Sequence, residues 1–352
     1  MGVIPEVKIK PTTTRMVSQP GMAGTVAVIG AFDNVSTEEK VYSFNTLTAA
    51  QEELTPLEGY DIFDKLFRRD SGASSLLCVN ITTNGTSDTK ETEMTNEKLV
   101  SALNLLKGEK YDILFIAAEL TDEGLTTVKE FLDDAYDLQK PVGVIAPLNR
   151  ASDTLATASA KIFESGGLYG LITQKFTLSD NKTLSLVESA AYYCGVVAGL
   201  KIDQSMTMSQ LPDVINVSPE YGYSDNEEGY NLVTAGVTVV RCMDRINNKY
   251  VVVNSELPSG LDLYIERTKD YVIRDICLEE FLGDKSTSNT ITAIKSMIET
   301  KKQLFINTLS LLEDLNYNVE KESPKCVNVY LDSLVFAGVI TTINIHVVVE
   351  VE

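Results

Sequence analysis

The sequence predicts an α/β fold: a mixed sheet covered by helices, followed by a smaller α+β domain, with extended strand arms at both ends. Short apolar runs typical of buried strands alternate with segments of helical periodicity through the first two thirds of the chain. The last third changes to strands followed by one long helix, and both ends alternate apolar with polar residues. At 352 residues the chain also exceeds what one hydrophobic core usually serves, which predicts two domains.

The first 20 residues predict an arm outside the core. Val3, Val7 and Ile9 share one face of an alternating run, with Ile4 on the other, as in a short strand. A polar stretch at 12–15 follows and predicts a flexible leash. We therefore interpret residues 1–20 as an N-terminal linker arm.

The α/β domain begins with an apolar run at 25–30, which predicts a buried strand ended by Gly30. Further strands are predicted at 76–81, 113–117, 142–146 and 170–173. A helix between them places Val128, Phe131, Leu132 and Ala135 on one face. Alternation of strands and helices predicts a parallel or mixed sheet covered on both sides.

A capping box marks the start of another helix in this domain. The Ser185 hydroxyl and the Glu188 carboxylate can satisfy each other's free backbone amides at a helix N-terminus. The residues of that helix are mostly small, so we expect it to pack very closely against a neighbour: Ala190, Ala191, Cys194, Val197 and Ala198.

The last third predicts a separate module. An irregular connection at 203–231, with an acidic loop at 225–228, precedes the expected boundary. Beyond it we expect strands at 236–241 and 249–254 and then a helix over 290–315. The apolar stripe of that helix consists of Ile294, Met297, Ile298, Phe305 and Leu312.

The C-terminal end predicts a second arm. After a short strand at 335–337, residues 342–352 are rich in β-branched residues, which favours a strand through Ile343, Ile345, Val347 and Val349. Terminal strands can pair with the chain's own sheet or with that of a neighbour, and their position leaves both open. The predicted organisation is an N-terminal arm (1–20), an α/β domain (21–235), an α+β domain (236–335) and a C-terminal arm (336–352).

Composition excludes several classes of partner. Thirty Lys and Arg against fifty Asp and Glu give a formal charge of −20, which argues against nucleic acid. No run reaches the length of a membrane span, and no signal peptide is evident, so we expect a cytosolic protein. The five cysteines are scattered and odd in number, which favours free thiols.

Neither a catalytic nor a cofactor or metal site is predicted. The sole histidine, His346, lies in the C-terminal β run, which excludes a Ser-His-Asp or Cys-His site within the α/β domain. The turn at Gly30 lacks the spacing of a dinucleotide-binding motif, and Phe32 stands where a pyrophosphate would approach. Gly166 and Gly167 lack the Lys of a P-loop and predict a turn. The acidic residues Asp225, Glu227 and Glu228 lack the pattern of a calcium loop.

Several segments follow one another in a characteristic order: 60–81 (YDIFDKLFRRDSGASSLLCVNI), 189–199 (SAAYYCGVVAG) followed by 205–207 (SMT), 228–231 (EGYN), 235–241 (AGVTVVR) and 265–274 (IERTKDYVIR), with the β-rich terminus. Together, in this order, they resemble the sheath protein of contractile phage tails and related bacteriocin or injection particles. The chain is short for the family, which implies few outer domains.

The resemblance implies a structural subunit, not an enzyme, that stacks as hexameric rings around an inner tail tube. It implies that both arms lend strands to sheets in adjoining subunits, and that contraction from a metastable extended state drives the tube through a target envelope. Its partners would be copies of itself, the tube protein, and the baseplate and tail terminator proteins. Such particles assemble in the bacterial cytoplasm, without cofactors and without inserting into a membrane.

In the family a helix of the C-terminal domain faces the tube, and the matching segment is 290–315. We expect Lys295, Lys301 and Lys302 to attract an acidic tube surface, because they are cations in an acidic chain; a solvated helix face is the alternative. Two other functions remain open: another tail or capsid structural protein, and an α/β hydrolase or nucleotide-binding enzyme, which would need a site that the sequence does not display.

Overall fold

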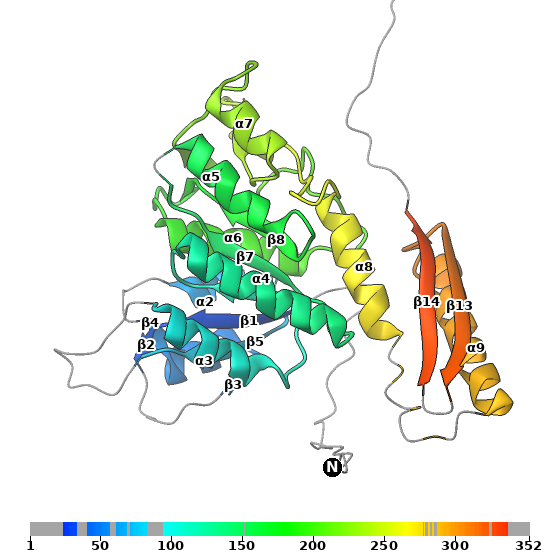
Figure 1. Ribbon diagram of the computed structural model, residues 1–352. Helices are drawn as coiled ribbons and strands as arrows, with labels where there is room; N and C mark the ends of the chain where they lie inside the picture. The colour runs from blue at the N-terminus through cyan, green and yellow to red at the C-terminus, as the bar shows by residue number, and fades with distance from the viewer. Residues whose placement is uncertain are drawn as a thin grey trace, which may run out of the picture.

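A six-stranded mixed sheet forms the centre of the α/β unit (Figure 1). The computed structural model describes residues 24–33, 41–56, 61–68, 71–82, 94–150, 152–276, 278, 281, 284, 287–323 and 326–336. In sheet order the strands are β3 (Val41–Phe44), β5 (Ser75–Asn80), β1 (Thr25–Gly30), β6 (Ile113–Ile116), β7 (Gly143–Pro147) and β8 (Leu168–Ile172). Only β3 runs antiparallel to its neighbour, so the predicted mixed sheet is confirmed.

The five predicted strands lie within two residues of β1, β5, β6, β7 and β8. Their side chains are buried on both faces, because helices cover both sides of the sheet. The edge strand β3 is an addition to the prediction; its four residues are too short a run to stand out.

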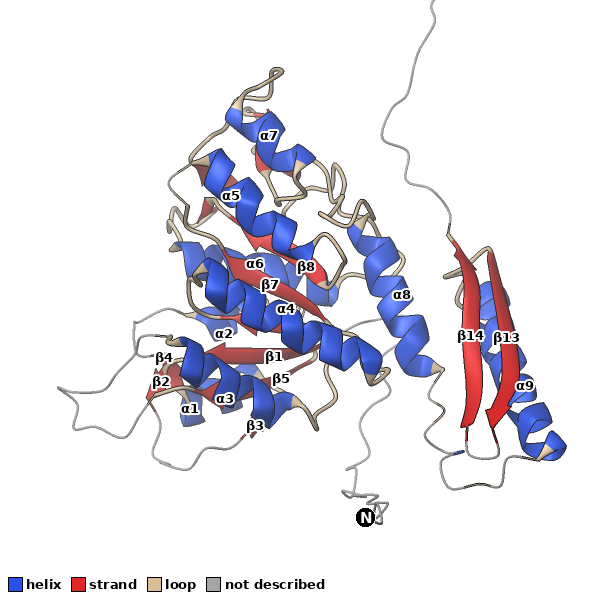
Figure 2. Ribbon diagram, in the orientation of Figure 1, coloured by secondary structure: helices blue, strands red, loops and turns tan. Residues whose placement is uncertain are grey.

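Alternate residues of the sheet belong to two hydrophobic clusters, one on each face. In β1, Val26 and Val28 pack with α2 (Ile62–Phe67) and α6 (Leu186–Gly199). Ala27 and Ile29 pack on the other face with α3 (Asn96–Leu106), α4 (Asp122–Asp137) and α5 (Asp153–Ala160). Figure 2 shows helices on both sides of the strands. Because successive side chains of a strand point to opposite faces of the sheet, every second residue of β1 lies in one core and the residues between them lie in the other.

Helix α6 is buried almost all round, as its small residues predict. The capping box is present: the Glu188 N–H donates to the Ser185 hydroxyl at 3.1 Å, and the Ser185 N–H donates to the Glu188 carboxylate at 2.8 Å. At Gly195 and Gly199, an added Cβ would overlap the carbonyl oxygens of Lys65 and Ser71. The absence of side chains at these two positions is therefore what permits the close approach of α6 to α2 and its following turn.

Short elements complete this unit. Strand β9 (Lys175–Leu178) pairs with β10 (Val214–Ser218), β11 (Val240–Asp244) pairs with β12 (Lys249–Val252), and β2 (Phe32–Asp33) pairs with β4 (Thr55–Pro56), all antiparallel. The remaining elements are α1 (Leu47–Glu53), the 3-10 turn η1 (Lys161–Phe163) and α7 (Glu228–Thr234). The expected irregular connection at 203–231 thus contains β10 and the start of α7.

Beyond α8 (Leu263–Asp275), the chain forms a helix and a long hairpin. Helix α9 (Ser288–Gln303) ends in a π turn (Leu304–Thr308), and β13 (Asp314–Ser323) then pairs with β14 (Cys326–Val335). The predicted extension of the helix to 315 is wrong. Ser310 takes a left-handed conformation that ends it, and the polar residues after Glu313 alternate with Leu315 and Val319 in the period of a strand.

The hydrophobic cores divide the last third between two units. Val240, Tyr250 and Val252 belong to the core of the α/β unit, whereas Val272 and Ile276 pack with α9 and the hairpin. The boundary expected after residue 235 stays a prediction, and a division near residue 271 follows these cores more closely.

Candidate assembly surface

Helix α8 joins the two cores and carries an unusual set of buried charges. Glu266, Arg267 and Asp270 are each at most 2% exposed. The Arg267 guanidinium donates to the carbonyl oxygens of Leu200 at 3.3 Å and Lys201 at 3.4 Å, at the end of α6. Because buried charges are costly without partners, these contacts fix how α8 lies on the α/β unit.

Further polar contacts of α8 reach the amino ends of the sheet strands. The Tyr169 hydroxyl donates to Asp270 at 2.7 Å, and the Gly167 N–H donates to Glu266 at 3.2 Å. The two glycines 166 and 167 have positive φ, as the predicted turn requires. At the end of α8, Arg274 forms an ion pair with Asp112 at 3.0 Å. The helix is therefore bonded to β8 and to the segment before β6.

Burial changes the acidity of this cluster. Desolvation raises the pKa of Asp270 to about 6, even though Lys269 and the Tyr169 hydroxyl oppose the shift. For Lys269, burial lowers the pKa, but the Asp270 and Glu266 carboxylates outweigh it, so the net direction is upward. The Lys269 ammonium lies 2.7 Å from a carboxylate oxygen of Glu266.

The β13–β14 hairpin has two open edges. Each strand is ten residues long, and among the described residues no third strand pairs with either outer edge. One face packs on α9 through the buried Leu315 and Val319 and the half-buried Val329. The other face is polar, with Tyr330 45% exposed. Along both outer edges, therefore, the backbone pairs with no further described strand, and edges of this kind can accept strands.

The three lysines expected to face a tube differ in their surroundings. Lys301 lies 2.8 Å from Asp275 and Lys302 lies 3.0 Å from Asp314. The hydrogen bond from Lys302 lowers the pKa of the Asp314 carboxyl. Lys295 is exposed and forms no ion pair with any described residue. Among the three lysines, Lys295 is therefore the one whose charge no acidic side chain in the described part of the chain neutralises.

Except for Phe336, both predicted strand arms lie outside the described residues, and so does His346. The hairpin itself is the feature that sequence reasoning missed. Its signal was the alternation at Leu315, Tyr317 and Val319, and again at Val327 and Val329, which the assumption of a longer helix concealed.

The Phe32 side chain fills the space next to the turn after Gly30. This side chain is 1% exposed and stacks on Phe63 with ring centroids 5.4 Å apart, next to the end of β1.

In the acidic loop at 225–228, the Glu227 carboxylate accepts a hydrogen bond from the Ser224 N–H at 2.7 Å. Among the described residues, no three His, Cys, Asp or Glu side chains are grouped to hold a metal.

The described cysteines are free thiols. Cys78 and Cys194 are buried, and Cys242 and Cys326 are half-buried; Cys277 lies outside the described residues. Burial raises the pKa of both Cys78 and Cys194 well above the usual range of a thiol, so these two are unreactive core residues. No described helix is both long enough and apolar enough to cross a membrane.

Comparison with known proteins finds likeness in structure. No family model matches the chain, and no curated protein matches its sequence. A sheath tail protein from Listeria innocua superposes with a TM-score of 0.65 at 14% identity, over 91% of this chain and 95% of that one. A sheath tail protein from Desulfitobacterium hafniense gives 0.65 at 12% identity, over 93% and 99%.

A third similar structure comes from an assembled particle. A chain of the helical sheath of the anti-feeding prophage, in its contracted state, superposes with a TM-score of 0.64 at 14% identity, over 99% of both chains. The fold predicted from the resemblance is therefore confirmed: it is the fold of tail sheath proteins, over nearly the whole chain.

Proposed function

We propose that this chain, which has the tail sheath fold, is a structural subunit that polymerises as stacked hexameric rings around an inner tube. Contraction of the polymer from a metastable extended state would drive the tube through a target envelope. The proposal assigns no catalytic role, and its partners are further copies, the tube protein, and the baseplate and terminator proteins. The likeness to a sheath chain in a contracted assembly supports it.

The observation that carries the proposal is the open-edged β13–β14 hairpin. A two-stranded sheet is marginal alone, and its long outer edges invite pairing with other chains. The two terminal arms have the alternating pattern of strands: Val3, Ile4, Val7 and Ile9 at one end, and Ile343, Ile345, Val347 and Val349 at the other. We infer that the arms of neighbouring subunits add to the two edges of each hairpin.

Strand addition suits a sheath that must change shape without falling apart. Each backbone hydrogen bond contributes roughly 0.5–1.5 kcal/mol net, so an arm that forms several bonds contributes a few kcal/mol. The bonds run along the main chain, while the polar leash at 12–15 can flex as subunits rotate. Each link is modest, but many repeated links hold the polymer together.

The tube-facing role of α9 remains a proposal that now centres on Lys295. Lys301 and Lys302 already have acidic partners in the same chain, which reduces the charge that they offer to a tube. Lys295 lies on the exposed side of α9 and keeps its positive charge available. An acidic tube surface is the partner that this charge would attract.

The experiment is negative-stain electron microscopy of the purified full chain beside two variants. One variant lacks residues 1–10 and 343–352. The other carries Val7→Pro and Ile9→Pro, which remove two backbone donors from the N-terminal arm without shortening it. Hollow, ring-stacked tubes from the full chain and none from either variant are expected.

A matched control places the same substitution outside the predicted strand. Thr13→Pro lies in the polar leash, where no ladder hydrogen bond is expected, and should leave tube formation intact. Circular dichroism checks that every variant keeps the fold. Compact monomers from the unaltered chain under all conditions would contradict the proposal and return attention to the enzyme alternative.

A further inference from the structure

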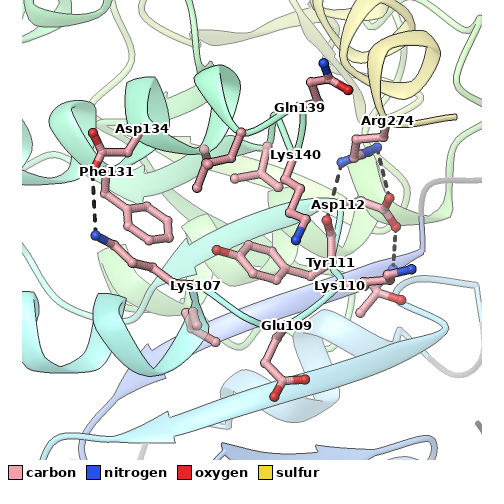
Figure 3. Close-up of a pocket in the computed structure, with 15 residues that line it drawn as sticks. Lys107, Glu109, Lys110, Tyr111, Asp112, Phe131, Asp134, Gln139, Lys140 and Arg274 are labelled. Atoms are coloured by element: carbon pink, nitrogen blue, oxygen red, sulfur yellow. Dashed lines mark hydrogen bonds and ion pairs between the residues drawn. The ribbon is translucent and has the colours of Figure 1, made fainter. Parts of the chain in front are cut away.

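A cavity of about 300 Å³ opens at the amino ends of β1, β6 and β7 (Figure 3). Its walls come from the C-terminal ends of α3, α4 and α8 and from the segments before β6 and β7. This is the end of the sheet at which the described chain begins, since Thr25, the first residue of β1, itself lines the cavity.

The lining of this cavity is largely apolar. Leu106, Tyr111, Phe131 and Val142 form its floor and walls, and Figure 3 shows the Tyr111 and Phe131 rings between Lys107 and Lys140. Leu138 also lines the cavity and is 62% exposed. An apolar surface that is both concave and open fits an apolar side chain from outside the described residues.

The chain enters the sheet at a fixed point beside the cavity. Asp112 accepts hydrogen bonds from the backbone N–H groups of Gly24 and Thr25, each at 3.0 Å. Its other carboxylate oxygen is held by Arg274 at 3.0 Å. These bonds hold residues 24 and 25 against the rim, so the residues immediately before them start within reach of the apolar lining.

Reach and composition identify the occupant. An extended chain spans at most about 3.6 Å per residue, so Met22 starts within roughly 11 Å of Thr25, and Met16 and Val17 within roughly 32 Å. These are apolar side chains in an otherwise polar and small-residue stretch. Methionine in particular adapts its shape to irregular apolar cavities.

We propose that this cavity binds Met22, with Met16 and Val17 beside it, from the same chain, and so fixes the direction in which the N-terminal arm leaves the α/β unit. The arm would then pivot from a set point near Thr25 while its tip pairs elsewhere. The proposal does not depend on the sheath function, because the cavity and its occupant belong to one subunit.

The chain has no tryptophan, so a single introduced one reports on the cavity. In Leu138→Trp, we expect blue-shifted emission and weak acrylamide quenching in dilute monomer. Removal of residues 1–22 should shift the emission to longer wavelength and increase quenching. Met22→Asn in the full-length Leu138→Trp chain removes the apolar side chain without adding a charge that the lining lysines could attract. It should shift the emission in the same direction, which keeps the test valid if the truncated chain does not fold.

A control with the same side chain separates docking from general effects. Leu155 on α5 is 49% exposed and does not line the cavity, so Leu155→Trp should emit alike in the full and shortened chains. Leu138→Trp emission that ignored both changes would overturn the proposal. Emission that shifted only with protein concentration would assign the cavity to a neighbouring copy and overturn it as well.

Discussion

At the residue scale, three ionisable side chains of α8 are buried where apolar side chains would be expected: Glu266, Arg267 and Asp270. Asp270 is 2% exposed and is held by the Tyr169 hydroxyl at 2.7 Å. Burying a carboxylate costs free energy unless it is paired or protonated. Desolvation raises the pKa of Asp270 to about 6; the Lys269 ammonium opposes this shift, whereas the Glu266 carboxylate adds to it.

The raised pKa of Asp270 predicts a specific pH dependence of stability. The folded state binds the proton of the Asp270 carboxyl more tightly than the unfolded chain does. The contribution of Asp270 to the free energy of unfolding therefore falls as the pH rises from about 4 to about 6, and it stays lower at higher pH. Asp270→Asn removes this penalty. The stability of the variant relative to the unaltered protein should therefore rise by about 2–3 kcal/mol between pH 4 and 7.

Urea unfolding at several pH values measures that difference. Carboxyls whose pKa is lowered in the fold, such as Asp122 and Glu188, are present in both proteins, so their opposite pH dependence cancels in the comparison. Asp137→Asn, at the exposed end of α4, reports the effect of removing one surface charge. A difference for Asp270→Asn that stayed constant across the range would refute the assignment.

At the element scale, the close packing of α6 rests on two glycines. An added methyl group at Gly195 or Gly199 would overlap backbone carbonyl oxygens of α2 and its following turn, which cannot move aside as a flexible side chain can. We expect Gly195→Ala and Gly199→Ala each to lower the free energy of unfolding by about 1–3 kcal/mol. Thermal and urea unfolding give the measurement.

Gly108 offers a matched control for those variants. It lies in the turn after α3, and an added Cβ there would meet no atom within 4 Å. Gly108→Ala should therefore leave stability within a few tenths of a kcal/mol of the unaltered protein. Equal effects at all three glycines would mean that close packing of α6 is not what selects its small residues.

Helix α9 allows charge and stability to be separated. Lys295→Glu reverses a charge that has no partner among the described residues, so it should weaken binding to an acidic tube with little change in stability. Lys302→Glu also breaks the pair with Asp314 and should lower stability slightly, because the pair is exposed to solvent. Cosedimentation with tube protein and urea unfolding measure the two effects; unchanged binding by Lys295→Glu would count against a tube-facing α9.

The sequence predicted elements best where their pattern was long or buried on both sides. The strands of the central sheet are continuous apolar runs, and the Ser185–Glu188 capping box fixed the start of α6. The prediction failed at the end of α9, because Leu312 and Leu315 continue the helical spacing although the chain has turned at Ser310. Over so few residues, the spacing of apolar side chains fits both a helix and a strand, so tertiary packing decides which of the two forms.

Polar contacts between residues far apart in the chain could not be predicted from the sequence either. Asp112, Tyr169 and Asp270 are separated by up to 158 positions, and nothing in their local spacing indicates that they meet around α8. The cavity at the amino end of the sheet depends on the same convergence of distant segments. By contrast, the terminal strands are predicted from local alternation, and because they lie outside the described residues, both their existence and their pairing remain predictions.

At the scale of the whole molecule, the formal charge of −20 opposes any assembly of copies. Strand pairing at the β13–β14 edges and apolar contacts act at short range, whereas the repulsion acts over the Debye length. That length falls from about 30 Å at 0.01 M salt to about 10 Å at 0.1 M. Raising the salt concentration should therefore weaken the repulsion far more than the backbone hydrogen bonds.

We accordingly expect tubes to form more readily at 0.3 M than at 0.01 M sodium chloride, with a lower protein concentration needed for assembly. Sedimentation gives the assembled fraction and electron microscopy its form. The variant lacking residues 1–10 and 343–352 should remain unassembled at both salt concentrations, because screening cannot replace the missing strands. Better assembly at low salt would instead mean that pairing of opposite charges between subunits, and not strand addition, dominates the contacts of the polymer.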